Sequence, residues 1–592
     1  MMNMKRMLLV SAALVMSAAA SFGQNFNPTV EVTNTYQGNP SEVHKPQLEM
    51  NVPDSLLRFD LDFDYEVFSK PYQGAYSFKP YMLDMRPEKD AWRGRKLYLK
   101  AGAGYSLHPQ LDFVFSPEQA GPFQMSVYAT HRSYFGRYHE VAPTLKDDGI
   151  YRLRKTGHGF SGHDAFTTAG FDGLYSWDRT ILSFGLGYYG VAAKDTVMSR
   201  SYNAFDFNAR VRSNNPDETS FFYDIAMNGR IANDNLDFKA FAFPGNVQVE
   251  RQNESLFRLD GLVGPVFDSR RSLLVRFEGE SASYGKFYDG NLGRIAVTPS
   301  YRLKSGRWDL NLGVKLEMAF SGEASDTLFF HKMNGGRGQI VYPDVHVGFL
   351  AGEKVSLYAD ATGGSRLNTY TSMISRNHHL NPSFMVSGDA DVMSPLTDNT
   401  VEKVNARIGV RGCVSSLQFD VNGGVGIYGN YLMESGLFVE SGLVPTLAYS
   451  DANVVYVNAL AGWKGDRFSV DADLRYRSLT YQDKNADNLG FGLPAYSGYL
   501  RLSYDITSRL YAGITVDAAS WREGKCAFAL SDDVVKVRVP GYVDLGLNCG
   551  YRFNRKLGFW LESGNLLCQP VQRNPFYAEK GLWATVGVTL SL

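Results

Sequence analysis

Apolar and polar residues alternate with a period of two along most of the chain from about residue 95 to residue 592. In the stretch 468–477, Phe, Val, Ala, Leu and Tyr alternate with Ser, Asp, Asp, Arg and Arg, and the stretch 308–318 repeats this pattern. The stretches 404–411 and 543–552 do the same. Successive side chains of a β-strand point to opposite faces, so each stretch predicts a strand with one apolar and one polar face.

The connections between these strands are short and long in turn. The short turns share small and charged residues and lie at 177–179, 213–216, 268–270, 304–306, 351–353, 464–466, 507–508 and 554–556. The longer connections are richer in Gly, Asn, Asp and His and lie at 135–165, 232–252, 321–338, 366–402 and 520–540. A soluble β-sandwich also alternates, but this asymmetry is typical of outer-membrane barrels, with the short turns on the periplasmic side.

The pattern therefore predicts an all-β fold, a transmembrane antiparallel β-barrel of about 22 strands over residues 95–592, with 20 strands as the alternative. Its outer face would contact outer-membrane lipids. The aromatic fraction of 14% and the 58 glycines agree with a barrel in which aromatic residues face lipid and small residues face the lumen. A barrel of this size encloses more space than its own side chains fill. The 60 Lys and Arg residues are nearly balanced by 61 Asp and Glu residues, so the sequence predicts no basic surface that would bind nucleic acid.

The first 94 residues differ from the rest of the chain. Lys5 and Arg6, the apolar run 7–20 and the small residues around Gly23 predict a cleavable signal peptide over 1–23, and thus export to the outer membrane of a Gram-negative bacterium. Residues 24–94 form a proline-rich extension that we expect to lie in the periplasm or in the lumen. Within it, one predicted strand is a candidate for docking a periplasmic or outer-membrane protein partner; its residues are Phe59, Asp60, Asp62, Phe63, Asp64 and Tyr65.

Charged residues in the polar phase of the predicted strands are candidates for lining the lumen. They could border a solute path, grip a polypeptide or pair with one another. They are Lys100, Arg132, Arg210, Arg276, Glu278, Lys315, Glu317, Arg407, Arg475, Arg501, Asp505 and Arg552.

Other motifs predict little chemistry. The glycine-rich stretches 185–190 and 424–429 match the dinucleotide fingerprint, but they lie inside predicted strands with no helix behind them, so we interpret them as strand glycines. The histidines near 158–163 and at 378–379 lack the spacing of a metal site, and we expect no metal, no cofactor and no catalytic residues. Cys526 and Cys568 fall on the same predicted side of the membrane, where a disulfide is chemically permitted.

The last fifty residues resemble the end of a TonB-dependent receptor barrel. The resemblance rests on the stretches 542–545 and 550–553, on Asn-Leu-Leu at 565–567, and on the apolar final strand 584–590. It implies a 22-stranded barrel around an N-terminal plug that an inner-membrane protein pulls open. Residues 24–94 are shorter than such a plug, so we expect a receptor-like barrel that lacks a recognisable plug domain.

Three functions follow from these observations. The first is transport of a solute through the lumen, and the second is a scaffold or accessory subunit of an outer-membrane complex. The third, a hydrolase in the barrel wall, would need a nucleophile beside a His, and no such pair stands out. We therefore expect a protein that is not an enzyme and whose substrate the sequence does not identify.

Overall fold

A computed structural model describes the chain from residue 96 to residue 592, except for the segments 106, 118–120, 197, 215–219, 239–250, 287–289, 323–340, 381–396, 440–441, 482–489 and 529–530. The predicted signal peptide, the extension 24–94 and its docking strand lie outside the described residues.

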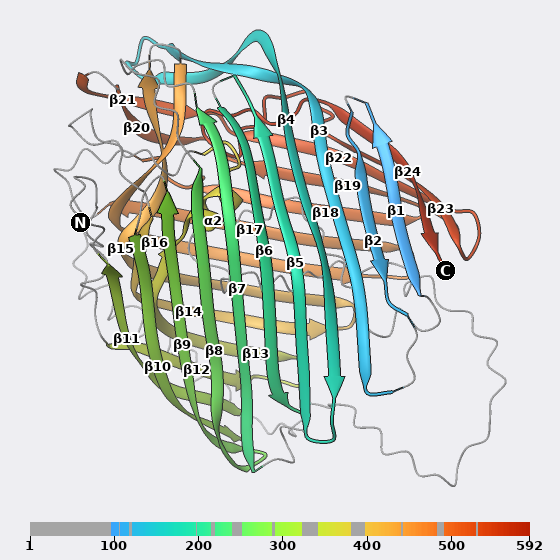
Figure 1. Cartoon of the computed structure of the whole chain (residues 1–592), viewed down its shortest axis with the longest axis vertical. Helices are drawn as coiled ribbons and strands as arrows, with labels where there is room; N and C mark the ends of the chain where they lie inside the picture. The colour runs from blue at the N-terminus through green and yellow to red at the C-terminus, as the bar shows by residue number, and fades with distance from the viewer. Residues whose placement is uncertain are drawn as a thin grey trace.

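The described residues form a single sheet of 24 strands and one short helix (Figure 1). The first twelve strands are β1 (Leu97–Gly104), β2 (Gln110–Phe115), β3 (Phe123–Leu145), β4 (Tyr151–Ser176), β5 (Thr180–Lys194), β6 (Met198–Ser213), β7 (Phe221–Phe238), β8 (Gln252–Asp268), β9 (Arg271–Lys286), β10 (Gly290–Ser305), β11 (Trp308–Gly322) and β12 (Val341–Leu350). The remaining elements are β13 (Val355–Asn368), α2 (Tyr370–Arg376), β14 (Asp398–Val414), β15 (Leu417–Val439), β16 (Gly442–Lys464), β17 (Phe468–Tyr481), β18 (Tyr496–Asp505), β19 (Leu510–Ala519), β20 (Arg522–Phe528), β21 (Ser531–Val539), β22 (Tyr542–Arg552), β23 (Leu557–Gly564) and β24 (Trp583–Ser591).

The sheet closes into a barrel because β1 pairs with β2 on one side and with β24 on the other. Consecutive strands pair antiparallel around the wall, but β19 pairs directly with β22. Strands β20 and β21 form a hairpin outside the wall, which leaves 22 strands in the barrel. The predicted fold and strand number are confirmed.

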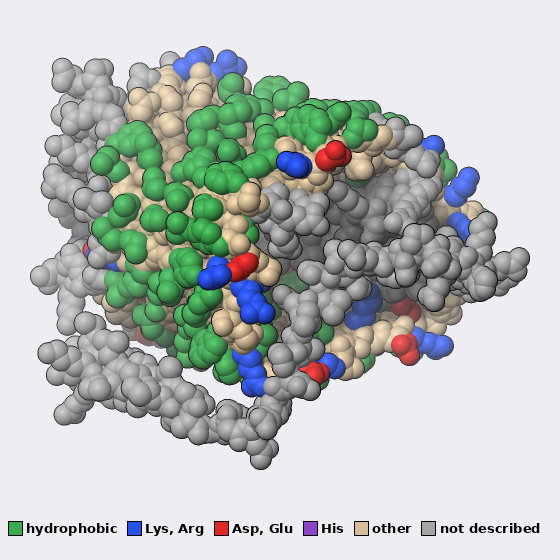
Figure 2. All heavy atoms as spheres, turned by 90° about the horizontal axis from the view of Figure 1, so that it is seen from below, with side chains coloured by type: hydrophobic (Ala, Val, Ile, Leu, Met, Phe, Trp, Pro, Cys, Tyr) green, Lys and Arg blue, Asp and Glu red, His purple; other side chains and the backbone are tan. Residues whose placement is uncertain are grey.

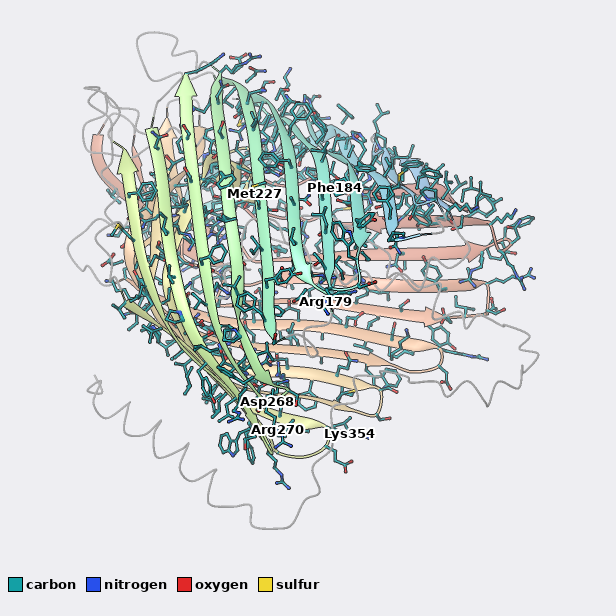
Figure 3. The ribbon with its side chains drawn as sticks, turned by 60° about the horizontal axis from the view of Figure 1, so that its bottom comes forward. Arg179, Phe184, Met227, Asp268, Arg270 and Lys354 are labelled. Carbon is teal, nitrogen blue, oxygen red and sulfur yellow. The ribbon has the colours of Figure 1, made fainter. Side chains whose placement is uncertain are left out.

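The two faces of the wall differ as the alternation predicts. On the outer face, Leu186, Phe205 and Ile231 are each 63% exposed. Apolar side chains cover this wall in Figure 2, and Phe184 and Met227 lie on it in Figure 3. On the inner face, Ala204 and Ala232 are buried. No helix among the described residues is long and apolar enough to cross a bilayer.

The short turns gather at one end of the barrel, where Figure 3 shows Arg179, Asp268, Arg270 and Lys354. At the opposite end the prediction of a loop over 135–165 is wrong, since β3 and β4 continue almost to the tip of their hairpin. Beyond the bilayer both faces of a hairpin can be polar, so the alternation is lost while the strand pairing persists.

Both glycine-rich stretches lie within strands, in β5 and in β15, as predicted. A Cβ atom at Gly424 would lie 2.7 Å from the hydroxyl of Tyr456, and one at Gly426 would lie 2.5 Å from that of Tyr428. These glycines therefore make room for large tyrosine side chains on the inner wall.

Candidate functional site: a lumen closed at its mouth

The predicted lumen charges lie on the face opposite the lipid-facing residues, and most of them form ion pairs, either within one strand or between strands that lie one or two apart in the wall. Lys100 lies 2.5 Å from Glu562, Arg132 lies 2.7 Å from Asp112, Arg210 lies 2.7 Å from Asp224, Lys315 lies 3.3 Å from Glu278, Arg407 lies 2.5 Å from Asp360, and Arg475 pairs with Asp473. The wall is thus lined by paired charges of both signs.

The remaining predicted charges do not join one site. Arg501 donates to the Tyr499 hydroxyl at 3.3 Å, and the backbone amides of Asp505 and Arg552 donate to carbonyl groups of the short-turn end. Arg276 lies on β9 in the lumen-facing phase. These four residues are spread around the wall on β9, β18 and β22.

Glu317 belongs to a network that the sequence did not point to. Its centre is Arg294, whose guanidinium lies 2.9 Å from Glu280, 3.3 Å from Glu278 and 3.6 Å from Glu317. Glu317 also accepts a hydrogen bond from the backbone amide of Ser365 at 2.7 Å. The inward phase of β10 is the one sequence feature that could have identified Arg294.

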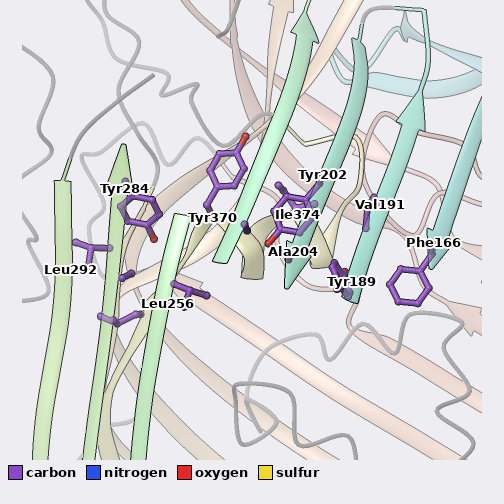
Figure 4. Close-up of a cluster of buried hydrophobic side chains, with 13 residues drawn as sticks. Phe166, Tyr189, Val191, Tyr202, Ala204, Leu256, Tyr284, Leu292, Tyr370 and Ile374 are labelled. Carbon is purple, nitrogen blue, oxygen red and sulfur yellow. The ribbon is translucent and has the colours of Figure 1, made fainter. Parts of the chain in front are cut away.

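Helix α2 lies in the mouth of the barrel, at the end opposite the short turns. It begins after Thr369, whose hydroxyl accepts from the backbone amide of Ser372, a typical N-cap. Tyr370 and Ile374 of the helix are buried in an apolar cluster with inward residues of β4 to β10 (Figure 4). The members of that cluster on the wall are Phe166, Tyr189, Val191, Tyr202, Ala204, Ala232, Leu256, Ala282, Tyr284 and Leu292, together with Leu367 of β13.

The helix also contacts another part of the wall. Met373 and the following Leu380 pack with Leu432 and Leu447, from the outer parts of β15 and β16. Helix α2 therefore bridges two regions of the barrel wall and occupies space between them.

Buried polar groups anchor the helix to β6, β7 and β8. The Tyr370 hydroxyl donates to Asp234 at 2.7 Å, and the same carboxylate accepts from Arg200 at 3.0 Å. The backbone amide of Thr371 donates to Glu254 at 3.0 Å. Because Asp234 and Glu254 are both buried, these bonds form where no water competes for them.

A second inserted segment is the connection 565–582 between β23 and β24. Its Arg573 lies 2.8 Å from both Asp517 and Asp544 of the wall, and it also pairs with Glu579 of the same segment. Tyr577 stacks on His379, which follows α2, with 3.7 Å between the ring centroids. The two inserted segments therefore hold each other as well as the wall.

Lys580 of this segment meets His108, between β1 and β2. The Lys580 ammonium donates to Nε2 of His108 at 2.7 Å, so the His108 ring carries its proton on Nδ1 and donates to Thr585 Oγ1 at 2.7 Å. Burial, reinforced by Lys580, lowers the pKa of His108 to about 2. Burial likewise lowers the pKa of Lys580 to about 8.

The hairpin β20–β21 crosses the mouth above these segments. Strand β20 pairs parallel with the end of β15, and β21 pairs parallel with the start of β4. Cys526 of the hairpin is buried with Phe438, Phe491 and Val537. The hairpin thus joins two distant parts of the rim through a continuous sheet. We call α2, the connection 565–582 and this hairpin together the cap.

The disulfide considered between Cys526 and Cys568 is absent: Cys526 is buried in the hairpin while Cys568 is exposed, and all four cysteines are free. Among the residues the structure describes, no group of His, Cys, Asp and Glu could hold a metal ion. His378, which follows α2, lies 2.8 Å from Asp164 of β4 and so adds a contact between the inserted segment and the wall.

No protein-family model and no curated protein matches the sequence. Among solved structures, the siderophore receptor PirA from Acinetobacter baumannii is 10% identical, with a TM-score of 0.57 over 84% of this chain and 80% of that chain. A mutant of the ferric enterobactin receptor PfeA from Pseudomonas aeruginosa is 13% identical, with a TM-score of 0.58 over the same shares. The copper transporter OprC is 15% identical, with a TM-score of 0.57 and the same coverage.

At these identities the likeness concerns the fold. It agrees with the predicted resemblance to receptor barrels, whereas the predicted absence of a plug stays a prediction because residues 1–95 are not described. The chain therefore has the barrel fold found in outer-membrane receptors for siderophores and in a copper transporter.

Proposed function

We propose that the protein is an outer-membrane transport barrel for a small solute and that the capped lumen is its closed state. The observation that carries this proposal is helix α2, which lies in the mouth while its polar anchors Asp234 and Glu254 belong to the wall. A wall that binds an inserted segment through specific side chains can release it and so open a path. The similarity to transport receptors supports the same function at the level of fold.

The contacts of the cap indicate that the lumen opens more easily by displacement of the cap than by removal of a strand from the wall. Every barrel strand is paired on both sides, whereas α2 is held by a few hydrogen bonds and two apolar clusters. Opening the lumen at the cap therefore disrupts fewer bonds than opening the sheet. In this proposal the paired charges on the wall line the path once the cap has moved.

Planar-bilayer recordings test this proposal. We expect the complete protein to conduct weakly, and a variant in which residues 370–380 are replaced by a Gly-Ser linker to conduct in steps typical of a wide pore. A matched control replaces the short turn at 351–353, at the end of the barrel opposite the cap, and should behave like the complete protein. If the linker variant folds but does not conduct, the lumen is not a solute path, and the scaffold function predicted from the sequence gains support.

A further inference from the structure

The three segments of the cap meet at Glu434, in the outer part of β15. Its side chain is only 8% exposed, and its carboxylate oxygen Oε2 lies 3.1 Å from the guanidinium of Arg522, the first residue of β20. The same guanidinium donates to the backbone carbonyl of Arg573, in the connection 565–582, at 2.5 Å. Glu434 therefore holds the hairpin β20–β21 directly and the connection 565–582 through Arg522.

The third segment, α2, faces the other oxygen of the same carboxylate. Nε of Arg376, in the last turn of the helix, lies 3.9 Å from Oε1 of Glu434, which is too far for a direct hydrogen bond. Both atoms are buried, and neither has a hydrogen-bond partner among the described residues. One is a donor and the other an acceptor, so a single bridging water molecule can satisfy both.

A cavity of about 10 Å³ lies at this position. Its lining residues are Arg376, Asn377, Leu380, Glu434, Ser435, Pro445, Leu447 and Pro575. The volume is about what one water molecule requires, and a water molecule needs at least two polar partners, which Arg376 and Glu434 supply. A cation is disfavoured there because the guanidinium of Arg376 is part of the lining.

Main-chain and ring contacts fix Glu434 at this junction. The backbone amide of Phe491 donates to the carbonyl of Glu434 at 2.7 Å, and Phe491 also forms a β-bridge with Gly524 of the hairpin. The ring of Phe576, from the connection 565–582, packs on the ring of Phe491 with 5.1 Å between the centroids. The carboxylate is thus positioned by the segments that it joins.

We propose that Glu434 is the latch of the cap and that one water molecule bound in the cavity completes it. The water accepts a hydrogen bond from Nε of Arg376 and donates one to Oε1 of Glu434, while Oε2 accepts from Arg522. Since one carboxylate then holds all three segments, α2, the hairpin and the connection move as a single unit. This inference rests on the proposed function, because movement of that unit is what opens the lumen.

Hydrogen–deuterium exchange of the purified protein in detergent, measured by mass spectrometry, tests the latch. Exchange of protected amides reports the opening equilibrium of each segment, so peptides from 370–376, 522–526 and 565–582 of the parent protein should report one common opening. The variant Glu434→Gln should accelerate exchange of all three segments roughly tenfold, because a charged acceptor is lost. The variant Arg376→Met should accelerate exchange of α2 alone, since the contact between Glu434 and Arg522 remains.

The matched control is Glu523→Gln. It neutralises a carboxylate next to Arg522 that pairs with Arg538 of the same hairpin, so all three segments should exchange as in the parent protein. Acceleration of a single segment in Glu434→Gln, or unchanged exchange of α2 in Arg376→Met, would overturn the latch.

A crystal structure tests the water molecule separately. We expect one water in contact with both Arg376 and Glu434, whereas a direct bond between these two side chains, or a cavity without density beside other well-defined buried waters, would overturn the bridge. Neither experiment measures conduction, so a failure of the latch leaves the proposed transport unaffected, and a lumen that does not conduct leaves the exchange results unaffected.

Discussion

Each end of the barrel contains an Arg–Asp ion pair, but the two pairs differ in their exposure to water. At the mouth, the Arg200–Asp234 pair is 0% exposed on both side chains and also receives Tyr370 from α2. At the short-turn end, the Arg271–Asp268 pair is 55% and 38% exposed. Water and salt compete with the second pair but not with the first. The comparison shows that one end is built to hold inserted segments, and the other only to reverse the chain.

Apolar side chains show the same contrast between the lumen and the lipid. Ile374 of α2 is fully buried in the mouth, whereas Ile231 of β7 faces outward on the wall. Both residues have apolar surroundings, which are lipid for Ile231 and protein side chains for Ile374. Only Ile374 belongs to a packed cluster of buried side chains. The side chains that pack in the mouth therefore form a hydrophobic core like that of a soluble protein, although they lie inside a membrane barrel.

Loss of the buried pair should have the largest effect. The variant Asp234→Ala leaves Arg200 buried without a carboxylate and removes the acceptor of Tyr370, which should destabilise the closed mouth by about 3–5 kcal/mol. Unfolding in detergent, followed by circular dichroism, measures this loss. The matched variant Asp268→Ala at the short-turn end also removes the acceptor of two backbone amides, but these groups are exposed, so the midpoint should fall much less. Equal effects of the two variants would remove the distinction between the ends.

Loss of packing should come next. The variant Ile374→Ala should cost about 3 kcal/mol because it leaves a cavity between α2 and the wall. Its counterpart Ile231→Ala faces lipid, which can follow the smaller side chain, so a smaller loss is expected. Urea or heat unfolding of both proteins in the same detergent compares them. If Ile231→Ala proved the more damaging, the mouth would not be a packed core.

The smallest effect concerns pH. Lys580 lies in the connection 565–582, outside the membrane-spanning strands, and burial lowers its pKa to about 8, against the opposing influence of Glu579 and Asp164. The folded protein therefore loses this proton at a lower pH than the unfolded chain does. Stability should rise as the pH increases from about 8 towards the ordinary lysine pKa. The difference in unfolding midpoint between the parent protein and Lys580→Met, measured across this range, isolates the effect; a difference that stays constant or falls would contradict it.

Much of the barrel wall was predictable, because strand alternation and turn length are local properties. The stretch 468–477 is part of β17, and 308–318 is part of β11, each with the predicted face towards lipid. The inward phase of Lys100, Arg132 and Arg407 was predictable for the same reason. The extended strands β3 and β4 were not, since the alternation fades where a hairpin leaves the bilayer.

The cap depends on contacts between residues that are far apart in the chain. Tyr370 meets Asp234 across 136 positions, and His378 meets Asp164 across 214. No spacing in the sequence relates such partners, because closure of the barrel brings them together. The sequence by itself determined a barrel wall of 20–22 strands with a charged inner face, since each strand carries its own two-sided pattern. Only the tertiary structure decided that α2 and the connection 565–582 lie in the mouth, because this depends on which connections fold inward once the wall has closed.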